Sequence, residues 1–443
     1  MAAAQRYPLN PVDHILLATH ESLRRRGYCG LSVVLLADLE GPLDSAALRS
    51  AVRRVGRTFP ALSARIRFTP IMRRACWEVA GDADTEEAIS YEYHKLCVAS
   101  EDTLAPISRV MGETIDLTHA PHVRLIHVET GKDRHRLGLC WAHPLMDLEG
   151  GHVLLRELHA VLCGEPTKLD PDPRATHPRP FKHAFPVSFF RAWQGRFRHA
   201  YYDSFRQPRL IGRPDVSHKA CGFQTRRYDA DFRRRFESIA KERTRPGPLR
   251  YTRALLIGIA RTYLAMAEDR GRPRDHFLFP QALPVPRPRH RPGVHGNYVT
   301  IPWVVFKRSE LHDWRCADVA ALRQFADYSR KSRDAATWEM FRAMQRWPFA
   351  VSRYLSEHRI PRGAAGFTSY RFDDSVTRIG HASITNLAGG GPMNCHPGWI
   401  VANTTYGDTM TISLTYFEDY VDPASATEFL DRLELEIGGE TQA

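Results

Sequence analysis

A histidine and an aspartate separated by three residues, His143 and Asp147, are the first candidates for chemistry in this sequence. The apolar run 135–142 before them predicts a buried strand, and Pro144 ends it. Helical spacing follows at 152–158, so the histidine falls where a strand gives way to a turn. Strand ends open onto clefts, and an imidazole titrates near pH ~6.5, so His143 is placed to accept a proton as a general base.

The same spacing occurs once more among the 21 histidines, at His199 and Asp203. That pair lies in a basic, aromatic segment that no strand pattern precedes and no glycine turn follows. The surroundings therefore favour His143 over His199. The plainer alternative is that His143 is a structural histidine at the end of a strand.

The length and composition limit the classes of protein to which this chain can belong. The 443 residues suffice for two domains or one large two-lobed unit, and 43% hydrophobic residues with 25% charged residues are ordinary globular values. A net charge of +12 favours anionic partners, unless the basic residues form a uniformly solvated surface. Arginine-rich runs at 24–26, 233–235 and 287–291 come without a nucleic-acid-binding motif, so we expect no nucleic-acid partner.

The cysteines and the apolar runs indicate a cellular setting. Eight cysteines are scattered without a C-x-x-C pair, which argues against a zinc ribbon or a disulfide framework, and we expect most of them to be reduced and structural. No apolar run approaches the ~20 residues of a membrane-spanning helix, and the first residues lack an export pattern. We therefore expect a cytoplasmic monomer.

A metal site is a rival interpretation of the same region. Strand alternation would point Cys140 and His143 to opposite faces of a sheet, and no closed four-ligand spacing emerges, so we expect no metal. The side chains that could contribute to such a site are those of Cys140, His143, Asp147 and His152, with those of His119, His122 and His127 nearby.

Helices and strands must position these residues, and both patterns run along the whole chain. The first half predicts helices at 12–26 and 43–59, and Asp44 or Ser45 can cap the helix at 43–59. It also predicts strands at 28–39, 61–68, 121–128 and 135–142, with a short strand and a helix within 80–113. A turn at 131–133 joins the last two strands, so the histidine follows a β-hairpin.

The second half repeats this coarse plan after a Pro-, His- and Arg-rich stretch and a helix at 189–205. It predicts helices at 230–243, 251–269, 312–333, 337–358 and 424–437, and strands at 223–228, from 277, 379–387, 398–406 and 410–416. We therefore predict an α/β fold of two similar lobes, each a mixed sheet with helices. The lobes would be 1–175, which carries the His143 motif, and 216–443, with a linker and crossing helix at 176–215.

One predicted helix carries an aromatic stripe. Such a stripe is usually a core face, and the alternative is peripheral contact with a membrane. The stripe consists of Trp338, Phe341, Met344 and Trp347, flanked by Arg342 and Arg346.

Several separated blocks resemble one superfamily, the condensation domains of peptide synthetases and their acyltransferase relatives with the chloramphenicol-acetyltransferase-like fold. The resemblance spans nearly the whole chain and rests on the order of the blocks. These are Pro8-Leu9-x-Pro11, Leu43-Asp44-x-x-x-Leu48-x-x-Ala51-Val52, Phe59-Pro60-Ala61-Leu62-x-x-Arg65, Ile115-Asp116-Leu117 with Pro121-x-x-Arg124, His143-x-x-x-Asp147, Pro284-Val285-Pro286-Arg287 and Gly296-Asn297-Tyr298-Val299. It implies two chloramphenicol-acetyltransferase-like lobes with a channel between them.

The motif departs from the usual His-His-x-x-x-Asp-Gly of that superfamily. Ala142 replaces the first histidine, and relatives with a single motif histidine are active acyltransferases. Leu148 replaces the glycine, which is delayed to Gly150 and Gly151. We expect those two glycines to support the turn. The leucine also suggests an alternative function, a catalytically inactive scaffold or carrier-protein docking module.

The resemblance implies transfer of an acyl group from a thioester to a hydroxyl or amine acceptor, with His143 as general base. It implies that Asp147 fixes the turn by pairing with Arg287 in the other lobe, with Arg289 close enough to compete. Asn297 is expected among the substrate-binding residues.

A tetrahedral intermediate also needs a hydrogen-bond donor for its oxyanion. The segment around Asn386 ends in Gly389, Gly390 and Gly391 and resembles the superfamily's C-terminal Ser-Asn-x-Gly-type block. Asn386, with Ser383 or Thr385, could supply the donor or contact substrate, as could a backbone N–H of the glycines. The co-substrate implied is acyl-CoA or an acyl-carrier-protein thioester, with a small-molecule acceptor and no bound cofactor.

Overall fold

The computed structural model describes residues 5–439 apart from several internal segments. These segments are 71–72, 80–87, 97–101, 167–218, 273, 285–295, 331–332, 360–362 and 392–397. The predicted linker and crossing helix at 176–215, and both Arg287 and Arg289, lie outside the described residues.

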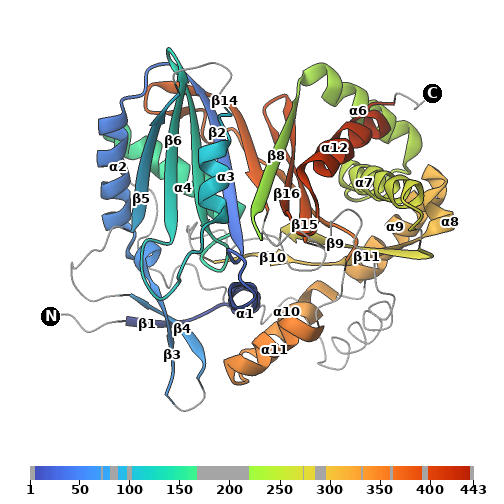
Figure 1. The fold of residues 1–443 in the computed structure, drawn as a ribbon, viewed down its shortest axis with the longest axis horizontal. Helices are drawn as coiled ribbons and strands as arrows, with labels where there is room; N and C mark the ends of the chain where they lie inside the picture. Colours follow the sequence, from blue (N-terminus) through green and yellow to red (C-terminus); the bar gives the residue numbers. More distant parts are fainter. Residues whose placement is uncertain are drawn as a thin grey trace.

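The first large sheet carries the predicted hairpin and its histidine. Its strands follow the order β13-β14-β2-β7-β6-β5, at the left of Figure 1. The predicted hairpin is confirmed, because β6 and β7 pair antiparallel, and Ser32 at the start of β2 lies opposite Ala142 at the end of β7. The strands are β2 (Ser32–Glu40), β5 (Ile89–Lys95), β6 (Val123–Gly131), β7 (Arg134–Ala142), β13 (Arg378–Ile379) and β14 (Ala382–Gly390).

Helices cover both faces of this sheet. Helices α2 (Ser45–Thr58) and α4 (Leu148–Leu162) bury one face with Leu35, Leu125 and Leu139, and α3 (Ala105–Gly112) buries the other with Val34, Ile126 and Cys140. The predicted cap of α2 is confirmed, since the Asp44 carboxylate accepts a hydrogen bond from the backbone N–H of Ala46.

A second large sheet lies beside the first, at the right of Figure 1, and follows the order β10-β9-β12-β15-β16-β8 with β11 on β9. Its strands are β8 (Cys221–Tyr228), β9 (His276–Pro284), β10 (Val299–Thr300), β11 (Trp303–Lys307), β12 (Gly366–Arg371), β15 (Trp399–Tyr406) and β16 (Thr409–Phe417). The helices beside it are α6 (Ala230–Arg243), α7 (Arg250–Asp269), α8 (Arg308–Leu311), α9 (Trp314–Arg330) and α12 (Pro423–Gly438). Both sheets mix parallel with antiparallel pairs, so the predicted mixed α/β fold is confirmed.

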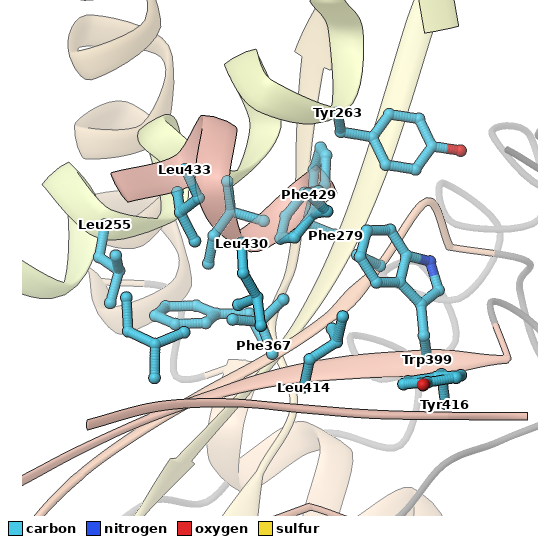
Figure 2. Close-up of a cluster of buried hydrophobic side chains, with 14 of the residues drawn as sticks. Leu255, Tyr263, Phe279, Phe367, Trp399, Leu414, Tyr416, Phe429, Leu430 and Leu433 are labelled. Atoms are coloured by element: carbon cyan, nitrogen blue, oxygen red, sulfur yellow. The ribbon is translucent and has the colours of Figure 1, made fainter. Parts of the chain in front are cut away.

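The core of the second half lies between this sheet and helices α7 and α12. Figure 2 shows Phe429, Leu430 and Leu433 of α12 facing Phe367 and Leu414 of the strands. The ring of Trp399 meets that of Phe429 edge to face, with centroids 4.7 Å apart. Such contacts bury one apolar face of α12 against the sheet.

The two halves of the chain share one sheet. Strand β14 comes from the C-terminal part of the sequence, yet it pairs with β2 and also contacts β15 and β16 of the second sheet. The predicted boundaries at 175 and 216 do not include this crossover, and the division into 1–175 and 216–443 stays a prediction.

A smaller layer lies below both sheets in Figure 1 and corrects two predictions. The helix predicted at 337–358 is two helices, because Pro348 cannot continue the first. The strand predicted at 61–68 begins with a 3₁₀ turn at Pro60–Ser63. This layer holds α1 (Pro11–Arg25), α10 (Arg333–Met344), α11 (Phe349–Arg359), β1 (Gln5–Pro8), β3 (Arg65–Phe68) and β4 (Ala75–Val79).

The aromatic stripe of α10 is largely a packing face. Trp338 and Met344 are buried, and Phe341 and Trp347 are partly covered. Membrane contact by this helix therefore stays a prediction. Across the described part of the chain, no helix is both long and apolar enough to cross a bilayer.

Phe429 tests the core between α12 and the second sheet. We expect Phe429→Ala to lower the free energy of unfolding by about 3–5 kcal/mol, because its ring is fully buried against Trp399. Urea unfolding followed by circular dichroism measures this. Tyr354→Ala is the control, since Tyr354 is 53% exposed and should change the value by less than about 0.5 kcal/mol. Equal effects of the two substitutions would contradict this account of the core.

Candidate active site

His143 is held by the protein through both its backbone and its ring. It follows β7 directly, and its backbone N–H donates to the Leu31 carbonyl at 2.9 Å. Ring atom Nδ1 lies 3.2 Å from the Met146 carbonyl oxygen, which also accepts a 2.8 Å bond from Trp141 Nε1. A carbonyl oxygen only accepts, so Nδ1 carries the proton in the neutral ring and Nε2 carries the lone pair.

The surroundings of His143 keep its ring neutral. Burial lowers the pKa of His143, against the opposing effects of the bond to Met146 and the charge of Asp147. Only 9% of the residue is exposed, and no described residue forms a hydrogen bond with Nε2. Burial therefore favours the neutral ring, and Nε2 makes no hydrogen bond within the described part of the chain.

Asp147 connects the histidine loop to a distant segment. It is the N-cap of α4, where Oδ1 accepts a 3.0 Å bond from the Gly150 N–H. Its Oδ2 accepts a 3.0 Å bond from the backbone N–H of Tyr298. The carboxylate therefore bonds a backbone N–H of α4 and one of a distant segment. The predicted pairing with Arg287 stays a prediction, because Arg287 lies outside the described residues.

The glycines after Asp147 support the turn by allowing close packing. A Cβ on Gly151 would lie 2.6 Å from a ring carbon of Trp141, the residue that bonds the Met146 carbonyl. Leu148, in the place of the usual motif glycine, packs against Gly389 of β14, where a Cβ would lie 2.8 Å from the leucine Cδ2. The missing side chain at Gly389 makes room for Leu148, and the cap of α4 remains intact.

Asn297 links the His143 loop to α1. Its backbone N–H and its Nδ2 donate to Asp13 Oδ1 at 2.9 and 2.8 Å, and Nδ2 also donates to the His143 carbonyl at 2.9 Å. Asn297 is fully buried, and its Oδ1 has no partner in the described part of the chain. Its role in substrate binding stays a prediction.

Asp13 is a site residue that the sequence analysis did not single out. It accepts from Asn297 and belongs to the capping box of α1, in which Asn10 Oδ1 accepts from the Asp13 N–H at 2.7 Å. Burial raises the pKa of Asp13 to about 8, and the charge of Asp147 adds to this effect. The Asn10-x-x-Asp13 spacing signals a helix start. Nothing in the sequence indicates its partner 284 residues away.

His20 is a second residue that sequence reasoning missed. Its Nδ1 accepts a 3.0 Å bond from the Leu31 N–H, and its Nε2 lies 3.1 Å from the Ile115 carbonyl. Gly30 permits this approach, because it has φ of 96° and a Cβ there would lie 2.6 Å from the His20 ring. His20 therefore bonds the backbone N–H of Leu31, the same residue whose carbonyl binds the His143 backbone.

The structure does not bring Asn386 to His143, which corrects the predicted oxyanion donor. Asn386 lies opposite Asp38, six residues along β2 from Ser32, the partner of Ala142. At ~3.3 Å per residue, this separates the two ends by about 20 Å. The amide of Asn386 instead bonds Asp38 at 3.2 Å and Thr411 at 3.2 Å.

Ser383 and Thr385 lie at this same distant end, because Ser383 pairs with Glu40 and Thr385 bonds the Asp38 carbonyl. These residues lie far from His143 because β14 runs antiparallel to β2. This direction brings the glycine end of β14, and not its start, toward His143. Gly390 pairs with Val34, only two residues from Ser32. Of the donors considered, the glycine backbone is the one placed toward the histidine.

The alternative interpretation as a metal site finds no suitable arrangement of ligand side chains in the described part of the chain. Within the described residues, no group of three or more His, Cys, Asp or Glu side chains is placed to hold a metal ion.

The substitution Asp13→Asn tests whether the buried carboxyl group of Asp13 is protonated in the folded protein. A raised pKa means that folded Asp13 retains a proton that the unfolded chain has released, so wild-type stability should fall as pH rises from about 4 through about 8. The amide cannot ionise, and the melting temperature of the variant should lack this decline relative to wild type. Thermal unfolding at pH 5, 6.5 and 8 measures the difference. Parallel profiles would show that Asp13 is ionised when folded.

Comparisons with known proteins concern the fold. No protein-family model and no curated protein matches the sequence. Solved structures that are similar include the first condensation domain of the calcium-dependent antibiotic synthetase (TM-score 0.68, 13% identity, 98% of this chain and 96% of that chain). The epimerization domain from the third module of tyrocidine synthetase B is also similar (0.65, 13%, 99% and 96%).

A third similar structure is the starter condensation domain of rhizomide synthetase, a mutant in complex with C8-CoA (TM-score 0.62, 13% identity, 98% of this chain and 94% of that chain). All three likenesses extend over nearly the whole chain. The chain therefore has the fold of the condensation and epimerization domains of peptide synthetases, as its sequence blocks predicted.

Proposed function

We propose that this protein is an acyltransferase that moves an acyl group from a thioester donor, acyl-CoA or an acyl carrier protein, to a hydroxyl or amine acceptor. The observation that carries this proposal is the neutral imidazole of His143, whose Nδ1 is bonded to the Met146 carbonyl and whose Nε2 has no bond to the described residues. A domain of the same fold was crystallised with C8-CoA, which supports a coenzyme A thioester as donor.

The chemistry needs one base. The acceptor hydroxyl or amine donates its hydrogen to Nε2 of His143, and its oxygen or nitrogen attacks the thioester carbon as the proton moves to the ring. The resulting oxyanion collapses, the carbon–sulfur bond breaks, and the imidazolium returns its proton to the leaving thiolate. The Met146 carbonyl accepts the Nδ1–H throughout, and it stabilises the ring while the positive charge is present.

His143 lies at a junction between segments from the two halves of the chain. Its loop bonds to the segment that leads into β10 of the second sheet, through the Met146–Gly296 bridge and the Asp147–Tyr298 bond. His143 thus lies where the first sheet meets a segment of the second. We propose a channel between two lobes at this junction, with the donor entering from one side and the acceptor from the other.

Asp147 acts in this proposal as a positioning residue. Its two oxygens bond backbone N–H groups of α4 and of Tyr298, so it holds the loop and does not touch the reacting atoms. Leu148 does not disturb this arrangement, because Gly389 accommodates it. This packing favours the acyltransferase over the alternative, an inactive scaffold or docking module.

His143→Ala should lower kcat by about 10²–10⁴-fold with a small change in KM, because the base acts in the transition state. Thiol release from a panel of acyl-CoA thioesters, with and without candidate alcohols and amines, measures it. His119→Ala is the matched control, since the His119 side chain is 70% exposed on a turn and should leave the rate unchanged. Acyl transfer that persists in His143→Ala would remove the proposed base. Absence of any acceptor-dependent thiol release from the wild type would favour the scaffold.

The pH dependence of kcat/KM tests the protonation state. The pKa of His143 lies below its ordinary value, so Nε2 keeps its lone pair to a lower pH than a free imidazole does. We expect the acidic limb of kcat/KM to lie below the pH of ~6.5 at which an ordinary imidazole titrates. An acidic limb centred above pH ~7 would mean that the ring is protonated at neutral pH, against its burial in the structure.

A further inference from the structure

Helices α1 and α11 pack against each other in the smaller layer at the bottom of Figure 1. Their facing sides meet through buried imidazole and hydroxyl groups. His14 Nε2 lies 2.9 Å from Ser352 Oγ, and farther along both helices Thr19 Oγ1 lies 2.6 Å from Ser356 Oγ. The two helices therefore run in the same direction, and the side of α11 opposite these serines faces away from α1.

The outward side of α11 exposes two large hydrophobic side chains. Tyr354 is 53% exposed and Val351 is 40% exposed, although most large hydrophobic side chains of the described residues are covered. The two residues are three positions apart on the helix and therefore share one face. A tyrosine combines an apolar ring with a polar hydroxyl, so it suits the boundary between an apolar phase and water.

Five arginines gather around α11. Four of them are exposed, and Arg353 is half-buried. They come from three parts of the chain that are distant in the sequence, so the fold and not a local run brings them together. The set consists of Arg25 at the end of α1, Arg73 and Arg74 before β4, Arg346 before α11 and Arg353 within α11.

Printed contacts place the arginines before β4 beside the start of α11. Arg74 donates to the Arg346 carbonyl at 3.1 Å. The guanidinium carbon of Arg73 lies 5.8 Å from the centroid of the Phe68 ring, and that ring packs against Phe349 with centroids 5.2 Å apart. Phe349 is the first residue of α11, so the basic surface begins where this helix begins.

The other end of the basic surface lies where α1 ends. Arg26, the neighbour of Arg25, bonds Glu357 of α11 at 3.3 Å. Arg353 lies one helical turn before Glu357. The end of α1 therefore meets the second half of α11, and Arg25 and Arg353 belong to one surface.

Arg353 lies among like charges. Burial lowers the pKa of its guanidinium, and the charges of Arg25 and Arg73 add to this effect. Glu357 and Glu21 oppose it, but each is already paired with another arginine. Within the described part of the chain, none of the five arginines forms an ion pair. Repulsion among these uncompensated charges favours an anionic partner.

We propose that this surface, Tyr354 and Val351 with the five arginines, binds a membrane that contains anionic phospholipid. The tyrosine and the valine insert at the level of the headgroups, and the arginines contact lipid phosphates. The positive charge alone would suit an acidic protein as well, and the exposed hydrophobic side chains among the arginines favour the membrane. This inference concerns lipid binding and does not depend on the proposed activity.

The test is co-sedimentation of the full-length protein with vesicles of phosphatidylcholine, alone or with about one-third phosphatidylserine. We expect binding only to the vesicles that contain phosphatidylserine, and we expect high salt to abolish it because salt screens exposed charges. The triple variant Arg25→Gln/Arg73→Gln/Arg353→Gln should bind about 10²-fold more weakly, since each arginine near an anionic surface contributes roughly fivefold. Tyr354→Ser should also weaken binding, without a change in melting temperature.

Three basic residues elsewhere provide a matched control. Arg54 and Arg57 are exposed on α2, and Lys132 is exposed in the turn between β6 and β7. The variant Arg54→Gln/Arg57→Gln/Lys132→Gln loses the same charge as the first triple variant and should bind like the wild type. An equal loss in both triple variants would mean that net charge alone drives binding, and this result would overturn the proposal.

Two further outcomes would overturn it. Wild-type protein that does not sediment with phosphatidylserine vesicles would assign the arginines to an acidic protein partner. Wild-type affinity in the first triple variant would place the lipid contact elsewhere on the chain. Circular dichroism shows whether each variant is folded, and the exposed Tyr354 keeps the test decisive if the triple variant fails to fold. Tyr354→Ser with unchanged binding would then remove the proposed insertion.

Discussion

The hydrogen bond from His143 Nδ1 to the Met146 carbonyl is the interaction on which the rest of the proposed chemistry depends. It selects one tautomer, and only that tautomer presents a basic nitrogen away from the chain. The carbonyl is fixed by Trp141, whose ring fits because residue 151 is glycine. Burial then keeps the ring neutral. The proton-accepting state is therefore a property of the packing around one peptide oxygen.

That packing depends on segments far apart in the sequence. Asn297, Asp13 and Asp147 tie the histidine loop to α1 and to the segment before β10, and all three are buried. A buried polar group costs free energy unless it is bonded, so such a network stabilises the fold only when its partners are in register. Because its partners must be in register, the network also favours one arrangement of the loop over others. A loop displaced by one residue would leave several buried donors and carboxylate oxygens without partners.

Whether a feature could be predicted from the sequence depends on how far apart along the chain its interacting residues lie. The hairpin before His143 and the cap at Asp44 are local, so residue spacing indicated them. The role given to Asn386 failed because it depends on the direction of β14 and on its pairing with β2, which no local pattern encodes. Asp13 looked like an ordinary helix cap, and only the fold reveals its second partner.

The Leu148–Gly389 contact links the turn at Asp147 to the long-range pairing of β14. A leucine occupies the motif's glycine position, but the turn is made by backbone bonds to Asp147, which do not depend on the side chain at 148. The leucine needs only space, and a glycine on β14 provides it. Because β14 comes from the C-terminal half and pairs with β2, the space belongs to the crossover that connects the two sheets. The unusual residue thus packs the helix after the histidine against β14, a strand of the first sheet that also contacts the second.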